Sequence, residues 1–256
     1  MQAVEFKNAQ TLFLREAHPV ESGRDVAVLV GTERESLFTI VFRERFSGLL
    51  FDSGAEATLH VHGDGFSLDA SAYYTKFSNY ISENQVDQVV CEAAAAPSGR
   101  EVELPCFQYQ QQDARYYGFE ADASLRVATL GAYTINADVL GDYVRANIID
   151  QGAIPRIPAA RVLGGIEAQG DTLQGRVEVE HVFEQNRIAA FETPTDDYTM
   201  VNASIGFSPF GKGSKTSFLI SANNIFDVEA RRSASFLKDF APLAGRDIRA
   251  TLRFGL

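Results

Sequence analysis

The sequence contains no tryptophan, only two cysteines and no long apolar run. A membrane-spanning helix needs about 20 consecutive apolar residues, and no window of the chain approaches that length, so a helical membrane protein is not expected. Catalytic motifs are missing as well, because there is no G-x-S-x-G, no H-E-x-x-H and no P-loop sequence. The carboxylates form no pair recognisable from the sequence, so we expect that the protein is not an enzyme; spacing alone leaves enzymes such as barrel lipases open.

Positive charge is also scarce. The chain has 23 Lys and Arg against 34 Asp and Glu, which gives a formal net charge of -11. Nucleic-acid binding normally needs a basic stripe, so no nucleic-acid partner is expected. A cationic ligand is weakly favoured, although acidic residues spread over solvated strand faces would give the same net charge without any ligand.

The start of the chain, MQAVEFKNAQTLFLREAH, has no basic segment followed by an apolar one. No signal peptide is therefore expected in this chain. Cys91 and Cys106 lie together in one long polar segment between expected strands. Such a pair favours a loop disulfide in an oxidising compartment; two free thiols in a cytosolic loop are the alternative.

The end of the chain predicts a strand whose two faces differ. Successive strand side chains point to opposite sides, so one face carries apolar residues and the other carries charges. A strand of this kind at the end of a chain, with an aromatic near its terminus, favours an outer-membrane barrel over a soluble sandwich. The apolar face comprises Ile248, Ala250, Leu252, Phe254 and Leu256, and the opposite face Asp247, Arg249, Thr251 and Arg253.

Similar two-faced segments occur along most of the chain, and the connections between them alternate between short and long. In outer-membrane barrels the periplasmic turns are short and the extracellular loops long, so the alternation assigns each connection to a side. The first 55 residues are less regular and could supply up to three more strands. Strands are expected at residues 56–62, 66–80, 116–128, 132–146, 160–168, 172–187, 198–208, 216–228 and 246–256.

Period-two apolar runs predict which face lies against lipid. No helix is expected for the alanine run at residues 93–96, which lies in the long cysteine loop. The predicted lipid face comprises Phe66, Leu68, Ala70, Ala72 and Tyr74; Tyr117, Phe119, Ala121, Ala123, Leu125 and Val127; Ile135, Ala137 and Val139; and Val201, Ala203, Ile205 and Phe207.

From Phe77 to its end the chain resembles the C-terminal barrel half of TonB-dependent outer-membrane receptors. The segment SANNIFDVEARRSASFLKDFAPLAGRDIRATLRF is similar to the last two strands of that family and the loop between them. Segments further upstream, such as FQYQQQDARYYGFEAD, are most similar to the zinc-uptake branch. The residues that match the family motif are Asn224, Phe226, Asp227, Phe236, Leu237, Gly245, Arg246 and Phe254.

The resemblance implies active import of a scarce nutrient across the outer membrane, with no cofactor and with zinc or a metal chelate as possible cargo. Partners would be outer-membrane lipid, a small ligand or metal at the extracellular loops, and the barrel-assembly machinery. The family also has an N-terminal plug domain, through which TonB is contacted, and a barrel of roughly 22 strands. No plug is recognisable in this chain, so contact with TonB is expected only through a plug domain absent from it.

A metal site is suggested by the segment H-V-H-G-D. His60 and His62 lie two residues apart on one strand face, with Asp64 in the following turn, and such imidazoles can bind zinc. The competing interpretation is structural, because this hairpin is assigned to the periplasmic end and a polar barrel interior tolerates histidines without any ligand.

The sequence therefore predicts an all-β, antiparallel up-and-down transmembrane β-barrel, partial, with about 9 to 12 strands and no plug domain. Residues 1–55 form an irregular N-terminal segment with possible additional strands, and residues 56–256 form the C-terminal portion of the receptor barrel. The parent protein is expected in the cell outer membrane. The alternative is a soluble acidic β-sandwich binding module, in which Phe119, Leu125, Ile205 and Phe254 would share a dry interior.

Overall fold

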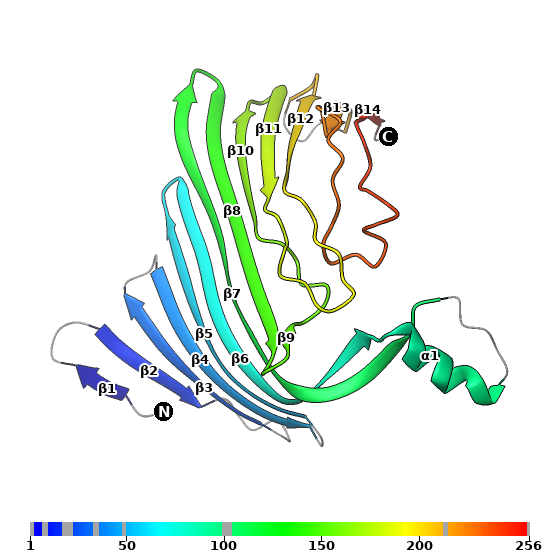
Figure 1. Ribbon diagram of the computed structural model, residues 1–256. Coiled ribbons are helices and arrows are strands. Elements are labelled where there is room, and N and C mark those ends of the chain that lie inside the picture. Colours follow the sequence, from blue (N-terminus) through cyan, green and yellow to red (C-terminus); the bar gives the residue numbers. More distant parts are fainter. Residues whose placement is uncertain are drawn as a thin grey trace.

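The computed structural model describes secondary structure for residues 3–6, 10–16, 23–32, 36–47, 50–98, 104–211 and 215–254, and side chains from residue 52 onward within these ranges. The described elements form one curved antiparallel sheet with a helical excursion (Figure 1). No described helix is long and apolar enough to cross a bilayer.

The sheet follows chain order almost throughout. Its order is β1-β2-β3-β4-β5-β6-β7-β8-β10-β11-β12-β13-β14, and β9 pairs only with β8. The strands are β1 (Ala3–Phe6), β2 (Gln10–Glu16), β3 (Gly23–Thr32), β4 (Ser36–Ser47), β5 (Leu50–Gly63), β6 (Phe66–Gln85), β7 (Phe107–Leu130), β8 (Tyr133–Ile148), β9 (Gly152–Ala153), β10 (Arg161–Gln169), β11 (Leu173–Val182), β12 (Tyr198–Phe207), β13 (Ser217–Asn223) and β14 (Asp247–Arg253).

This up-and-down order confirms the fold class predicted from the sequence, and each of the nine strands expected from residue 56 onward has a counterpart. The described sheet has 14 strands, more than expected, because four lie before residue 48 and β9 is a two-residue pairing. Unbroken apolar runs such as AVLV in β3 show no alternation of polar and apolar residues, so periodicity could not identify these segments as two-faced strands. Residue 55, the expected boundary, lies inside β5.

The expectation that the alanine run needs no helix is wrong. Helix α1 (Gln88–Ala95) includes residues 93–95 and continues into the 3₁₀ turn η1 (Ala96–Ser98). Its N-cap is Asp87, whose side chain accepts a hydrogen bond from the backbone N–H of Val89. An N-cap carboxylate satisfies one of the unpaired N–H groups at a helix start, and alanine is the strongest helix former. A helix of eight residues is too short for periodicity to reveal.

The apolar side chains do not share an interior. Phe119, Leu125, Ile205 and Phe254 are 51, 51, 49 and 72% exposed, and none of the described large side chains is fully buried. The soluble β-sandwich alternative is therefore not supported, because a sandwich would bury these residues between two sheets. A small core lies on the other face, where Ala114, Ala146, Ile148 and Ile154 pack with Phe77, Tyr80, Tyr116 and Ile157.

Candidate functional site

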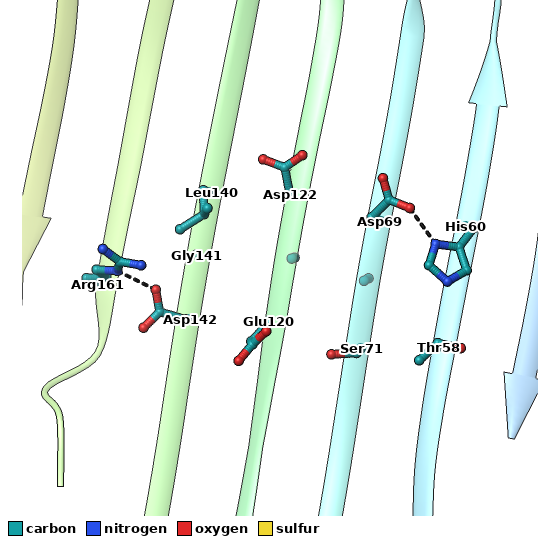
Figure 2. Close-up of a pocket in the computed structure, with 12 residues that line it drawn as sticks. Thr58, His60, Asp69, Ser71, Glu120, Asp122, Leu140, Gly141, Asp142 and Arg161 are labelled. Carbon is teal, nitrogen blue, oxygen red and sulfur yellow. Dashed lines mark hydrogen bonds and ion pairs between the residues drawn. The ribbon is translucent and has the colours of Figure 1, made fainter. Parts of the chain in front are cut away.

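The polar face of the sheet carries a hollow of about 380 Å³ that extends from β5 to β10 (Figure 2). Antiparallel register sets its lining, because the pairs His60–Asp69, Ser71–Glu120 and Asp142–Arg161 lie directly opposite one another on neighbouring strands. His60 Nδ1 lies 2.5 Å from Asp69 Oδ1, and Arg161 Nε donates to Asp142 Oδ2 at 2.5 Å. These contacts make a continuous polar wall.

Acidic groups dominate this wall. Asp69 faces Asp122 and Glu120 faces Asp142 across the strand pairs, although like charges placed directly opposite are destabilising. Among the described side chains, Arg161 is the one arginine or lysine that lines the hollow. The arrangement therefore gives the polar face a negative surface that attracts cationic groups.

The structure separates the residues predicted as a metal site. His60 and His62 both approach Asp69, with His62 Nε2 at 3.6 Å from Asp69 Oδ2. Asp64 instead pairs with Arg126 at 3.3 Å, and its side chain is almost fully exposed. Among the residues that the structure describes, no three His, Cys, Asp or Glu side chains are placed to hold a metal ion together.

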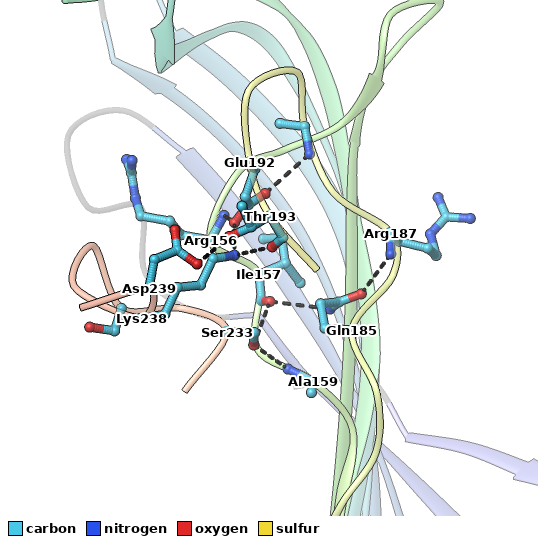
Figure 3. A network of polar contacts seen from close by, with 12 residues as sticks. Arg156, Ile157, Ala159, Gln185, Arg187, Glu192, Thr193, Ser233, Lys238 and Asp239 are labelled. Atoms are coloured by element: carbon cyan, nitrogen blue, oxygen red, sulfur yellow. Dashed lines mark hydrogen bonds and ion pairs between the residues drawn. The ribbon is translucent and has the colours of Figure 1, made fainter. Parts of the chain in front are cut away.

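A polar cluster centred on the buried Lys238 joins three long connections at the end of the strands from which they emerge (Figure 3). We call it the loop hub; it consists of Arg156, Glu192, Thr193, Lys238 and Asp239. Glu192 accepts hydrogen bonds from the backbone N–H of Arg156 at 3.0 Å and from Lys238 Nζ at 3.1 Å. Lys238 Nζ also donates to the Thr193 carbonyl at 2.6 Å, and Thr193 Oγ1 donates to Asp239 at 2.6 Å. The Lys238 and Glu192 side chains are only 6 and 12% exposed.

A second set of contacts ties the same connections together nearer the sheet. Ser233 Oγ accepts from the backbone N–H of Ala159 at 3.0 Å and donates to the Ile157 carbonyl at 3.3 Å. Gln185 Nε2 donates to the carbonyls of Ile157 and Pro158, each at 3.2 Å (Figure 3). The connections at residues 149–160, 183–197 and 224–246 are therefore held as one unit.

Part of the predicted family motif forms a clamp at the base of the last connection. Asn224 is buried, and its side chain accepts from Val228 N at 2.8 Å and donates to the Val228 and Ala244 carbonyls. Asp227 accepts from Arg246 N at 2.7 Å, and a Cβ at Gly245 would lie 2.7 Å from that same carboxylate oxygen, so a larger residue there would force the Asp227 side chain to shift. Phe226, Leu237 and Phe254 are exposed and take no part in the clamp.

The loop hub borders a cavity of about 640 Å³, a size typical of small-ligand sites. Four phenylalanines contribute to its lining, together with Gln110 and Gln112. Phe236, a motif residue, meets Phe107 edge-to-face with ring centroids 5.8 Å apart, and the Arg156 guanidinium lies 3.8 Å from the Phe236 ring centroid. The side-chain oxygen Oε1 of Gln112 is buried without a hydrogen-bond partner, which leaves an acceptor for a ligand.

Cys91 and Cys106 are bonded to each other in the structure, with their Cα atoms 5.8 Å apart. Cys91 is buried on α1, and Cys106 directly precedes Phe107 of the cavity wall. The bridge therefore joins the helical excursion to that wall.

In non-reduced material from an oxidising compartment, thiol titration should find no free cysteine, and reduction should release two. The bridge spans 15 residues and should restrict the unfolded loop by about 3 kcal/mol on the chain-entropy model. A Cys91→Ser/Cys106→Ser variant is the control for background thiol signal. Two reactive thiols in the non-reduced protein would contradict the prediction.

Sequence reasoning missed Arg156 and Glu192, because they lie in different connections and no local pattern links them. Lys238 was part of the matched segment, but a lysine in a loop is normally solvent-exposed, so its burial was not foreseen. Asp69 could have been identified as the partner of His60. The predicted turn at residues 63–65 fixes the register of the hairpin, and that register places Asp69 opposite His60.

The sequence matches the family of TonB dependent receptor-like β-barrels over residues 52–225. The fold is similar to that of several solved transporters and receptors. The copper transporter OprC matches with a TM-score of 0.72 and 16% identity, over 91% of this chain and 39% of that one. The FrpB iron transporter from Neisseria meningitidis matches with a TM-score of 0.67 and 12% identity, over 91% and 38%.

The siderophore receptor PirA from Acinetobacter baumannii gives a TM-score of 0.62 and 10% identity, over 96% of this chain and 43% of that one. At these identities the likeness establishes the fold alone. The chain thus spans about two fifths of the length of the solved structures that it matches.

Proposed function

Because the chain belongs to the TonB-dependent receptor β-barrel family, we propose that it forms the C-terminal part of an outer-membrane barrel that imports a scarce nutrient. Proteins of this family are outer-membrane receptors and transporters and not enzymes. The observation that carries the proposal is a continuous antiparallel sheet with an exposed apolar face and an acidic, hollowed polar face. Hydrocarbon would lie against the first face and water against the second.

The dimensions of the apolar face support this orientation. Tyr117 and Val127 are ten residues apart on β7, which corresponds to about 33 Å along the strand. At the tilt of about 40° usual in membrane barrels, this span covers about 25 Å of bilayer, the height of the apolar band in such proteins. Tyr74 stacks on Tyr117 at 6.4 Å, as expected of an interfacial aromatic row.

The loop hub and the adjoining cavity would then face the cell exterior and contact the cargo. The long connections emerge from the same end of the strands, and in membrane barrels that end is extracellular. TonB-dependent receptors interact with TonB; here that contact would be made through a plug domain, which is not among the described elements. Insertion of the barrel would depend on the barrel-assembly machinery, with outer-membrane lipid around the apolar face.

For the cargo we propose a metal ion such as zinc, or a metal chelate. The similar solved structures include a copper transporter, an iron transporter and a siderophore receptor. The acidic wall would favour entry of a cation, and His60 and His62 would offer it transient nitrogen ligands. The cavity has room for a chelate.

Cells that lose this protein should take up less of the cargo when it is scarce, and a protonophore should abolish the difference, because import draws on the energised inner membrane. The measurement is uptake of radiolabelled zinc, copper and ferric siderophore by the deletion strain and by the same strain resupplied with the gene. Equal uptake of all three in both strains would contradict the metal proposal.

Zinc itself is tested in the purified protein. His60→Ala should weaken zinc binding by about tenfold or more in calorimetry, because one of two neighbouring imidazoles is removed. Asp64→Asn is the matched control; its carboxylate pairs with Arg126 and should leave zinc affinity unchanged. Unchanged affinity in His60→Ala would reject the histidine contact.

A further inference from the structure

Four basic side chains gather on the apolar face, just beyond the end of the apolar band toward the long connections. We call them the basic cluster: Lys76, Arg115, Arg145 and Arg187. Lys76 on β6 lies directly opposite Arg115 on β7, and Arg115 lies opposite Asn147 on β8. Arg187 reaches the same place from the connection after β11, since its Nη2 donates to Asn147 Oδ1 at 2.7 Å.

The basic cluster shares the face that carries exposed aromatic side chains, since Tyr74 and Phe119 are 49 and 51% exposed. The rings of Tyr74 and Tyr117 stack at 6.4 Å, and those of Phe119 and Tyr143 lie 5.7 Å apart. Lys76, Arg115 and Arg145 follow or precede Tyr74, Tyr117 and Tyr143 by two residues and therefore share their face. The cluster begins about 7 Å beyond the row formed by Tyr74 and Tyr117.

None of the four members forms a salt bridge with a described carboxylate, and the nearest described acid in the lining shared by Arg145 and Arg187 is Glu184. The arginines Arg126, Arg161 and Arg176, by contrast, are each paired with an aspartate. Like charges directly opposite, as in Lys76 and Arg115, are destabilising unless an anion lies between them.

A small cavity next to the cluster offers a place for such an anion. It measures about 120 Å³, and its lining includes Arg145 and Arg187, the acidic Glu184, and Ala146 and Ile157 at the edge of the small core. The Nε atom of Arg145 is buried there and has no hydrogen-bond partner. A buried donor of this kind is costly unless a partner outside the chain satisfies it.

We propose that the basic cluster binds the phosphate groups of an anionic lipid headgroup in the outer leaflet. Arginine binds phosphate through two parallel N–H donors, and basic residues at a membrane surface favour anionic lipid. A lipid is favoured over a free anion because the site adjoins the aromatic row that marks the edge of the hydrocarbon. The inference rests on the proposed membrane location.

The test uses the protein purified from outer membranes in detergent and freed of lipid. Binding of diphosphoryl lipid A, of the same lipid without phosphates and of inorganic phosphate is measured by native mass spectrometry. The wild type should bind the phosphorylated lipid about tenfold or more tighter than the dephosphorylated one. The triple variant Lys76→Gln/Arg115→Gln/Arg145→Gln should lose that preference, and Arg115→Gln alone should lose part of it.

Arg126→Gln is the matched control, because it removes the same charge from the same strand at the opposite end and should keep the preference. No preference in the wild type, or an unchanged preference in the triple variant, would overturn the proposal. Displacement of the lipid by equimolar inorganic phosphate would show a free-anion site and would overturn the assignment to a lipid. Heat-modifiable migration on gels is recorded for every variant. If the wild type does not show it, the membrane barrel itself is contradicted. If the wild type shows it but has no lipid preference, only the proposed headgroup site is wrong.

Discussion

Replacing Lys238 with alanine should lower the free energy of unfolding by about 3 to 5 kcal/mol. The side chains of Lys238 and Glu192 are 6 and 12% exposed, and the ammonium group joins the Glu192 carboxylate to the Thr193 carbonyl. Removal of the ammonium would leave a negative charge buried without a cation, which costs far more than the ion pair itself contributes. The loop hub should then come apart, and the cavity beside it should lose one wall.

This effect is measured by urea unfolding in detergent micelles, followed by circular dichroism. Amide hydrogen exchange at Arg156 and Ala189, whose N–H groups both donate to Glu192, would show whether the loss is local. Arg249→Ala is the control. The Arg249 side chain is 72% exposed, so its ion pair with Asp247 should contribute at most about 1 kcal/mol to stability. Equal stability of Lys238→Ala and Arg249→Ala would contradict the expected role of the hub. The double variant Lys238→Met/Glu192→Gln should recover much of the loss, since it leaves no buried charge.

Replacing Val139 with arginine should destabilise the membrane-inserted fold by about 2 to 4 kcal/mol. Val139 lies on the apolar face and pairs with Ala123 and Gly164, near the middle of the apolar band. An arginine there would place a charge in the hydrocarbon, where neither water nor a carboxylate can reach it. The cost should fall toward the ends of the band, because the side chain can then extend to the interface.

Leu140→Arg provides a matched control at the next position. Leu140 points to the polar face, lies opposite Asp122 and lines the acidic hollow, so an arginine there should be tolerated within about 1 kcal/mol. Both variants are compared by urea unfolding in lipid vesicles and by heat-modifiable migration. Equal destabilisation by the two substitutions would mean that the faces are not exposed to different solvents, and the proposed barrel would be wrong.

The two predictions depend on different levels of information. The consequence of Val139→Arg follows from the sequence, because the alternation of Ala137, Val139 and their polar neighbours already assigns faces. The consequence of Lys238→Ala could not be foreseen, since Lys238 and Glu192 are 46 residues apart and lie in separate connections. The helix α1 was missed for a related reason: its eight residues are stabilised by an N-cap and positioned by the Cys91–Cys106 bridge, neither of which gives a periodic signal.

By itself the sequence determined the antiparallel strands from residue 56 onward, their two faces and the motif that clamps the last connection. These features are local, because the period of a strand and the geometry of a turn depend on neighbouring residues. Only the tertiary structure decided that Asp64 pairs with Arg126, that three connections meet around Glu192, and that basic residues from β6, β7, β8 and a distant connection converge beside an aromatic row. Such meetings arise from strand register and loop packing over long sequence separations, which no local pattern encodes.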